Sequence, residues 1–161
     1  MRFLSIDPGY DKLGIAIVEG TANNPTLVFS KCFRTDRGDS HADRLKYISA
    51  EISRTIKQFR PNTLAIESLL FSVNKKTAIK VAEARGVILS VASQNNLDVV
   101  EIAPQTIKVA ITGYGSATKK QVVFMIPRLL KIKLSEKKED DEFDAIAIGI
   151  TAICLNKGAR C

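Results

Sequence analysis

The order of apolar runs along the chain is the feature that most limits its fold. Three short runs come first, at residues 2–6, 13–18 and 26–33, and the turn signals Pro8-Gly9 and "GTANNP" separate them. Short apolar runs with turn residues between them are typical of consecutive strands joined as hairpins. We therefore expect the first three elements to be neighbouring antiparallel strands.

The spacing of apolar residues changes after Ser40. They then recur at intervals of three and four as far as Pro61, a pattern that predicts an amphipathic helix. Two further strands are expected, "TLAIE" at 63–67 and "LDVVEIA" at 97–103, with a helix over 75–95 between them. A strand that is followed by a helix and a second strand predicts parallel pairing in one sheet.

The last third of the chain is expected to be helical. Helices are predicted over 104–111, 118–132 and 141–156, and Pro127 predicts a kink or an early end in the second of them. The whole order is β-β-β-α-β-α-β-α-α-α. It predicts an α/β fold with a five-stranded mixed sheet flanked by helices.

Length and composition agree with a single domain. The chain has 161 residues, of which 45% are hydrophobic, and this is enough for one compact domain over 1–158 with a short tail at 159–161. No apolar run approaches the ~20 residues that a membrane span needs. Cys32, Cys154 and Cys161 form no CxxC pair and are expected to be small apolar residues in a reducing compartment. We expect a soluble, cytoplasmic protein that does not contact a membrane.

The charge of the chain is strongly basic. The formal net charge is +7, and many of the lysines and arginines are clustered. A basic surface of this kind indicates a polyanionic partner such as nucleic acid. A surface that is basic only for solubility remains the alternative.

Four carboxylates stand at the ends of predicted elements. Asp7 ends the first strand and Glu67 ends the strand at 63–67, while Asp141 and Asp144 lie three residues apart at the start of the last helix. Parallel strands bring their carboxyl ends to the same edge of a sheet, so the four groups can converge there. Taken singly, each has an ordinary alternative as a turn former, a solvated strand end or a helix N-terminal acid.

Several carboxylates without histidine or thiolate suit hard cations such as Mg²⁺ or Mn²⁺. Two such ions can activate water and stabilise the leaving oxygen when a phosphodiester bond is hydrolysed. The acidic residues and the basic surface together predict a nuclease.

Five motifs occur in a fixed order over residues 2–155: "IDPG", "AIES", "AEARG", "APQTIKVAITGYGSATKKQV" and "DEFDAIAIGIT". In these motifs the chain resembles the RuvC family of crossover (Holliday) junction endodeoxyribonucleases. The resemblance implies an RNase H-like fold, a homodimer, and symmetric Mg²⁺-dependent nicking of four-way junction DNA in recombination and repair. By position, Asp7, Glu67, Asp141 and Asp144 match the four catalytic carboxylates of the family, which hold two Mg²⁺ ions.

The same resemblance implies a set of DNA-binding residues. The segment "SLLFSVNKK" is similar to the junction-probing loop of the family, in which an aromatic residue stacks on exposed bases. Leu70 stands where several members have an aromatic residue, so the details of junction distortion are open. Basic positions in "QTIK" and "ATKKQ" match residues that meet DNA near the cleaved bond. The expected set is Leu70, Phe71, Asn74, Lys75, Lys76, Lys108, Lys119 and Lys120.

The predicted helix 75–95 carries a second apolar stripe, formed by Ala84, Val87 and Val91. By resemblance this stripe is expected at the dimer interface, and burial within one subunit is the alternative. The sequence leaves open whether a branch-migration motor complex of the RuvA and RuvB type delivers the junction. An RNase H-like nuclease acting on another nucleic acid and a non-catalytic junction-binding protein remain rival functions.

Overall fold

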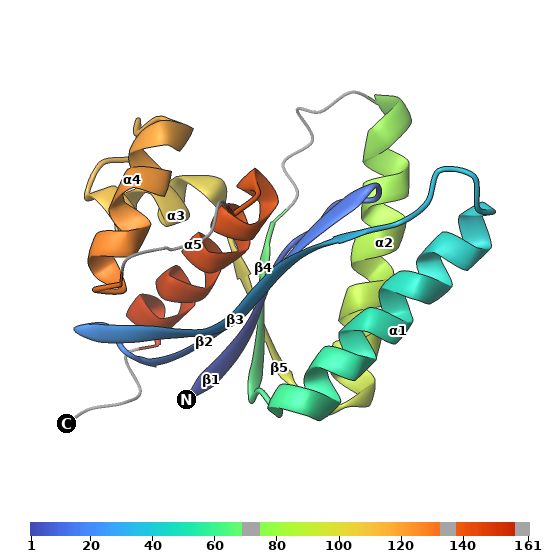
Figure 1. The fold of residues 1–161 in the computed structure, drawn as a ribbon, viewed down its shortest axis with the longest axis horizontal. Helices are drawn as coiled ribbons and strands as arrows, with labels where there is room; N and C mark the ends of the chain where they lie inside the picture. Colours follow the sequence, from blue (N-terminus) through green and yellow to red (C-terminus); the bar gives the residue numbers. More distant parts are fainter. Residues whose placement is uncertain (69–74, 133–137, 157–161) are drawn as a thin grey trace.

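The sheet has five strands, as the sequence predicts, and helices cover both of its faces (Figure 1). The computed structural model of the protein describes residues 1–68, 75–132 and 138–156. The strand order is β3-β2-β1-β4-β5. The strands are β1 (Arg2–Asp7), β2 (Lys12–Thr21), β3 (Asn24–Arg34), β4 (Thr63–Glu67) and β5 (Asp98–Ile102).

Both kinds of strand pairing occur in this sheet. Strands β1, β2 and β3 form an antiparallel meander, and β4 and β5 continue the sheet in parallel with β1. The predicted fold class is therefore confirmed, because the two hairpins and the two crossovers appear in the expected order.

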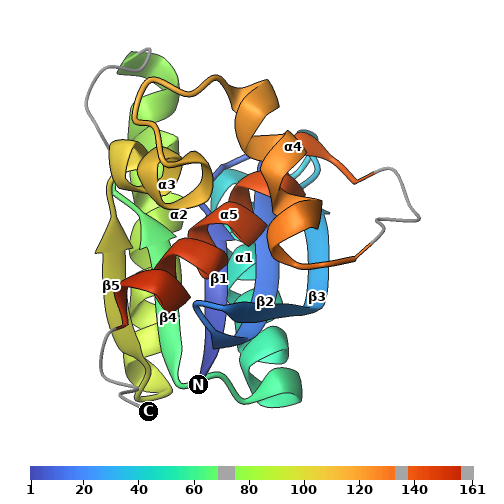
Figure 2. The same ribbon diagram turned by 90° about the vertical axis from the view of Figure 1, so that its left-hand side faces the viewer.

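The helices form two layers. Helices α1 (His41–Phe59) and α2 (Lys75–Gln94) cover one face of the sheet. Helices α3 (Pro104–Thr112), α4 (Lys119–Leu129) and α5 (Asp140–Leu155) cover the other, which Figure 2 shows from the front. Within the described residues, no helix is long and apolar enough to cross a membrane.

Strand β1 is buried on both faces. Its side chains alternate, so that Phe3 belongs to the apolar cluster under α5 while Leu4 and Ile6 belong to the cluster under α1 and α2. Residues 3–6 are all buried, and Asp7 at the end of the strand is only partly buried. A charged group can therefore stand at this end of the strand, where the helical layers no longer enclose it.

Two glycines allow α5 to lie unusually close to the sheet. A Cβ atom on Gly149 would lie 2.6 Å from both Ser5 Oγ and Val18 Cγ2. A Cβ atom on Gly14 would lie 1.9 Å from the backbone carbonyl oxygen of Asp141, in the first turn of the helix. The absence of side chains at these positions brings the N-terminus of α5 against β2, next to Asp7.

Helix α2 packs within the subunit more completely than the sequence predicts. Ala84 is 0% exposed and Val91 is 5% exposed, and both belong to the apolar cluster shared with α1. These two side chains already pack against α1 and the sheet, so they leave little surface for a partner, and their place in a dimer seam stays a prediction. Val87 is half-buried against the same cluster.

The end of α4 agrees with the prediction from Pro127. The helix continues only to Leu129, and Lys131 then adopts a left-handed backbone with φ of 53°. Proline has no N–H to donate to the preceding turn, and this weakens a helix that would otherwise run further.

Gly14→Ala is expected to destabilise the protein by about 1–3 kcal/mol, because the new methyl group would push the first turn of α5 off β2. Gly38→Ala is the matched control, since a Cβ atom there would meet only the Asp36 carboxylate, at 3.3 Å. This variant should stay within about 0.5 kcal/mol of the wild type. Denaturant unfolding measures both, and equal stabilities for the two variants would contradict the role given to Gly14.

Candidate active site

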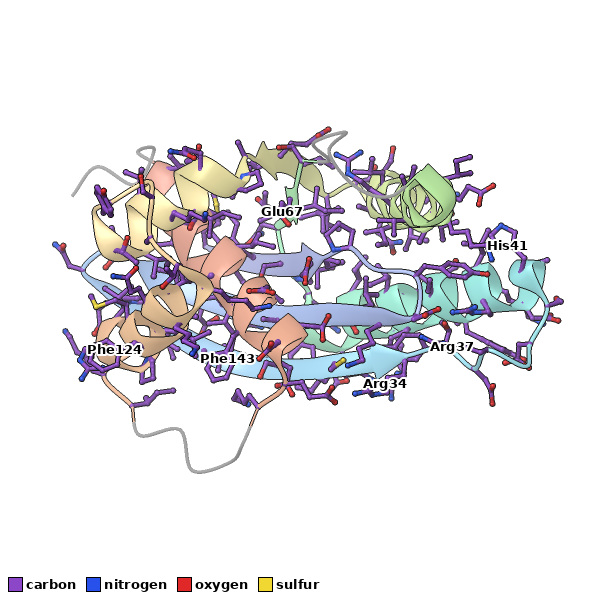
Figure 3. The ribbon with its side chains drawn as sticks, turned by 90° about the horizontal axis from the view of Figure 1, so that it is seen from above. Arg34, Arg37, His41, Glu67, Phe124 and Phe143 are labelled. Carbon is purple, nitrogen blue, oxygen red and sulfur yellow. The ribbon has the colours of Figure 1, made fainter. Side chains whose placement is uncertain are left out.

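Three elements bring the predicted acidic residues to one edge of the sheet. Asp7 and Glu67 are the last residues of β1 and β4, which are parallel neighbours with Ile6 paired to Ile66. Asp141 lies in the first turn of α5, directly above Gly14. Seen from above, Glu67 lies near the middle of the molecule, where these strands end (Figure 3).

Asp7 has the most perturbed carboxyl group of the site. Burial raises its pKa to about 7, and the negative charges of Asp144, Glu67 and Asp141 add to this effect in that order. The Lys119 ammonium acts in the opposite direction. The other three predicted acids are therefore close enough to Asp7 to influence its carboxyl group.

Glu67 and Asp144 are affected in the same way. Burial is the main cause that raises the pKa of Glu67, and the Asp144 charge raises it further. The pKa of Asp144 is also raised, chiefly by burial, although its hydrogen bond with Lys119 opposes the change. Crowded, partly buried carboxylates are costly to ionise, and a bound cation relieves that cost.

Lys119 is the cation that contacts this group. It is the first residue of α4, whose N-terminus is fixed by a capping box between Thr118 and Gln121. Its Nζ atom donates a hydrogen bond to Asp144 Oδ2 at 2.7 Å and lies 3.7 Å from Asp140 Oδ2. Burial alone would lower the pKa of Lys119, but the bond with Asp144 and the surrounding negative charges raise it overall. The lysine therefore stays protonated among the acids.

Asp141 stands at the border of the acidic group. Its carboxylate, that of Glu139 and the Cys32 sulfur lie within 4.8 Å of one another, the only such set of three among the described residues. Burial first, and then the two carboxylates, raise the pKa of the Cys32 thiol to about 11. A thiol that keeps its proton is a poor metal ligand, so this set offers oxygen ligands only.

The donor chemistry of the site fits a hard divalent cation. The four predicted ligands are carboxylates, and neither an imidazole nor a thiolate stands among them. The pKa values of Asp7, Glu67 and Asp144 are raised, first by burial and then by the neighbouring carboxylates, and Lys119 is the cation that opposes this effect. The carboxylate oxygens of Asp7, Glu67 and Asp144 do not all lie within 4.8 Å of one another in the described part of the chain. In this they differ from the ligand atoms of the Cys32 set.

Comparison with known proteins identifies the family. The family model described as crossover junction endodeoxyribonuclease RuvC matches residues 3–152. The chain belongs to the RuvC family. It is 42% identical over 155 residues to the RuvC of Thermosipho melanesiensis, covering 96% of each chain. It is 41% identical over 154 residues to the RuvC of Fusobacterium nucleatum, covering 95% of this chain and 80% of that one.

Solved RuvC structures have the same fold. The Thermus thermophilus RuvC structure is 29% identical to this chain with a TM-score of 0.85, covering 94% of this chain and 92% of that one. The same enzyme in complex with Holliday junction substrate superposes with a TM-score of 0.87, with the same identity and coverage. A yeast mitochondrial Holliday junction resolvase, 12% identical over 94% of this chain and 77% of its own, shares the fold with a TM-score of 0.70.

Only some of the predicted DNA-binding residues lie in the part of this RuvC chain that the structure describes. Of the basic ones, Lys119 contacts the acids, Lys120 is exposed on α4, and Lys108 on α3 forms no ion pair within the described residues. The rest cannot be placed. Leu70, Phe71 and Asn74 lie outside the described residues, as do the side chains of Lys75 and Lys76.

Two acidic neighbours of the site were not predicted. Asp140 lies beside Lys119, and Glu139 pairs with Arg34 and, at 3.6 Å, with Lys12. The run "EDDEFD" contains both residues, and its length was a signal that more than two acids could face this RuvC site.

The raised pKa of Asp7 predicts how the stability of the metal-free protein depends on pH. The folded protein holds a proton on Asp7 up to about pH 7, whereas the unfolded chain releases it near 3.8. The folded state therefore binds more protons within this window, and stability falls as the pH rises through it. The loss is about 4 kcal/mol at most, at ~1.4 kcal/mol per pKa unit.

Asp7→Asn should flatten this dependence, and in EDTA at pH 8 it should be at least as stable as the wild type. Asp39→Asn, in an exposed loop, is the control and should follow the wild-type curve. Melting temperatures from pH 5 to pH 8 measure the effect. A marked loss of stability in Asp7→Asn would mean that Asp7 has a structural role.

Proposed function

We propose that this protein is a structure-selective endonuclease that resolves four-way (Holliday) DNA junctions in the cytoplasm, in recombination and repair. The observation that carries the proposal is the group of interacting carboxylates at the ends of β1, β4 and the start of α5. Membership of the RuvC family and the likeness to the junction-bound Thermus thermophilus enzyme support it.

The acidic group is proposed to hold two Mg²⁺ ions, for which Mn²⁺ can substitute. Asp7, Glu67, Asp141 and Asp144 are the proposed ligands. Burial and neighbouring negative charge make Asp7, Glu67 and Asp144 harder to ionise without a cation, and the Asp141 charge contributes to this effect at Asp7 and Asp144. When bound, the metal supplies an activated water and stabilises the charge on the leaving oxygen.

The protein's own residues prepare the site for a phosphate. The partial burial of Asp7 and Glu67 limits the access of bulk water, which strengthens every charge interaction there. Lys119 carries its ammonium on a flexible side chain, and we propose that it exchanges Asp144 for a phosphate oxygen when DNA binds. Its position at the N-terminus of α4 adds backbone N–H groups on the same side.

The substrate class can be tested on one gel. Labelled four-way junction, linear duplex and RNA–DNA hybrid are each incubated with Mg²⁺ and with EDTA. Paired symmetric nicks are expected only in the junction with Mg²⁺. Cleavage of the hybrid would favour an RNase H-like activity, and junction binding without cleavage would favour a non-catalytic binding protein.

Asp7→Asn is expected to abolish detectable junction cleavage, because the site loses a charge on which metal binding depends. Junction affinity in EDTA should stay close to wild type, since the phosphate backbone is bound by basic residues. Asp39→Asn should cleave normally. If Asp7→Asn also fails to bind junctions, the proposed division between binding and cleavage is wrong.

We further propose that the active form is a homodimer, because a junction with two-fold symmetry requires two symmetrically placed sites. For the dimer interface we propose a face of helix α2 other than the predicted stripe of Ala84, Val87 and Val91. Ile79 is 66% exposed, Ala82 is exposed on the next turn, and a Cβ atom on Gly86 would meet nothing within 4 Å. An exposed isoleucine beside small residues can pack against a second copy of the helix.

Ala82→Arg should therefore shift the protein to monomer in sedimentation velocity and replace paired nicks by single ones. Ala50→Arg, an exposed position on α1, is the control and should remain dimeric. A dimer that survives Ala82→Arg would place the interface elsewhere.

A further inference from the structure

A basic hollow lies immediately beyond the turn that follows Asp7. It has a volume of about 690 Å³ and is formed by the β1–β2 turn, the loop after β3, and one turn each of α1 and α2. Four of its lining residues are cationic and one is acidic. The lining residues are Gly9, Tyr10, Asp11, Lys12, Arg37, Arg44, Lys80 and Val81.

The floor of the hollow is formed by buried, hydrogen-bonded side chains. Tyr10 is 8% exposed, and its hydroxyl is hydrogen-bonded to His41 Nδ1 at 2.7 Å. The Arg44 guanidinium lies 3.8 Å from the centre of the Tyr10 ring and donates hydrogen bonds to Thr35 Oγ1 and the Tyr10 carbonyl. Arg44 thereby fixes the β1–β2 turn against the loop after β3.

The charges in the hollow do not cancel. Asp11 accepts hydrogen bonds from both Arg44 and Arg37, the latter at 2.7 and 3.1 Å, and Arg44 is the main cause that lowers its pKa. The single negative charge of Asp11 is therefore shared between the guanidinium groups of Arg37 and Arg44. An excess of positive charge remains, and the Arg37 side chain, at 82% exposure, carries it toward solvent.

Lys80, on α2, adds a second exposed charge to the lining of the hollow. Its Nζ atom lies 5.3 Å from the centre of the Tyr10 ring, and it forms no ion pair with any described residue. A lysine held over an aromatic ring at a hollow with excess positive charge is placed to bind an anion. Lys12, whose pairing with Glu139 is long at 3.6 Å, completes the rim.

The hollow lies close to the acidic site. Gly9 lines it and is two residues from Asp7, so their Cα atoms are at most about 7 Å apart. The turn itself is tight, because a Cβ atom on Gly9 would lie 1.9 Å from the Lys12 carbonyl oxygen. In Figure 3, Arg37 and His41 lie on the side of the molecule away from Phe124, and Glu67 lies between the two sides.

We propose that this hollow binds a backbone phosphate of the DNA substrate a few nucleotides from the bond that is cut, with Lys80 and Arg37 as the contacting residues and Tyr10 and Arg44 as positioning residues. The proposal rests on the proposed function. A phosphate site at this position gives a reason for the four cationic side chains around the β1–β2 turn, since chain reversal alone does not require them.

Lys80→Gln tests the phosphate contact, with Lys57→Gln as the matched control on the exposed far end of α1. Junction affinity is measured in EDTA as a function of salt. Loss of one contact should weaken binding about eightfold at 0.1 M salt and reduce the slope of log K against log salt by about 0.9. Arg37→Gln/Lys80→Gln should lose about two such contacts, and Lys57→Gln should match the wild type.

A chemical change in the DNA makes the test position-specific. Single neutral methylphosphonate linkages are placed one at a time on both sides of the cleavage position. At one of them the wild type should lose about eightfold in affinity, whereas Lys80→Gln should lose little more than it already has. A purely structural role for Lys80 would produce no such position.

The outcomes separate the two proposals. Wild-type junction binding and cleavage report on the proposed function, whereas the difference between Lys80→Gln and Lys57→Gln reports on the hollow. The same comparison on linear duplex keeps the hollow testable even if junctions are not the substrate, because the backbone is the same. Equal affinities and salt slopes for the two variants would overturn the proposal.

Discussion

The close packing of α5 on the sheet is the constraint on which the rest of the structure depends. Gly149 and Gly14 remove the side chains that would hold the helix away from β1 and β2. This contact buries one face of the sheet and also carries the acids of the first helical turn to the end of β1. The same packing therefore builds the core and the site, and a larger residue at position 14 would disturb both.

Electrostatic repulsion at that site is balanced by a neighbouring helix. Burial and mutual repulsion make Asp7, Glu67 and Asp144 harder to ionise. Lys119 from α4 supplies a positive charge near them and contacts Asp144 directly. The capping box at Thr118 fixes the start of α4, so the lysine is delivered to a defined place. A site of this kind is costly to the metal-free fold and becomes favourable when cations and a phosphate arrive.

The β1–β2 turn separates a negatively charged region of the protein from a positively charged one. Before the turn, Asp7 belongs to a group with excess negative charge, and beyond it Arg37, Arg44 and Lys80 surround a hollow with excess positive charge. A metal-dependent site needs the first environment, and a DNA backbone needs the second. In the proposed function, these two environments lie a few residues apart, so that one strand of DNA is held and cut by the same short segment of chain.

Much of this was determined by the sequence alone. The order of strands and helices, the ends of elements at Asp7 and Glu67, and the early end of α4 at Pro127 follow from local patterns that tertiary packing did not override. The ordered sequence motifs predict membership of the RuvC family, and the family model confirms it.

Only the tertiary structure decided which surfaces remain free and which charges meet. The apolar stripe at Ala84 and Val91 could equally face a partner or α1, because periodicity shows that a face is apolar and not what covers it. The hollow at Tyr10 joins residues from four separate segments, and no local pattern connects them. Local spacing determines which side of an element is apolar or charged, whereas the contact between distant elements depends on how the whole chain packs.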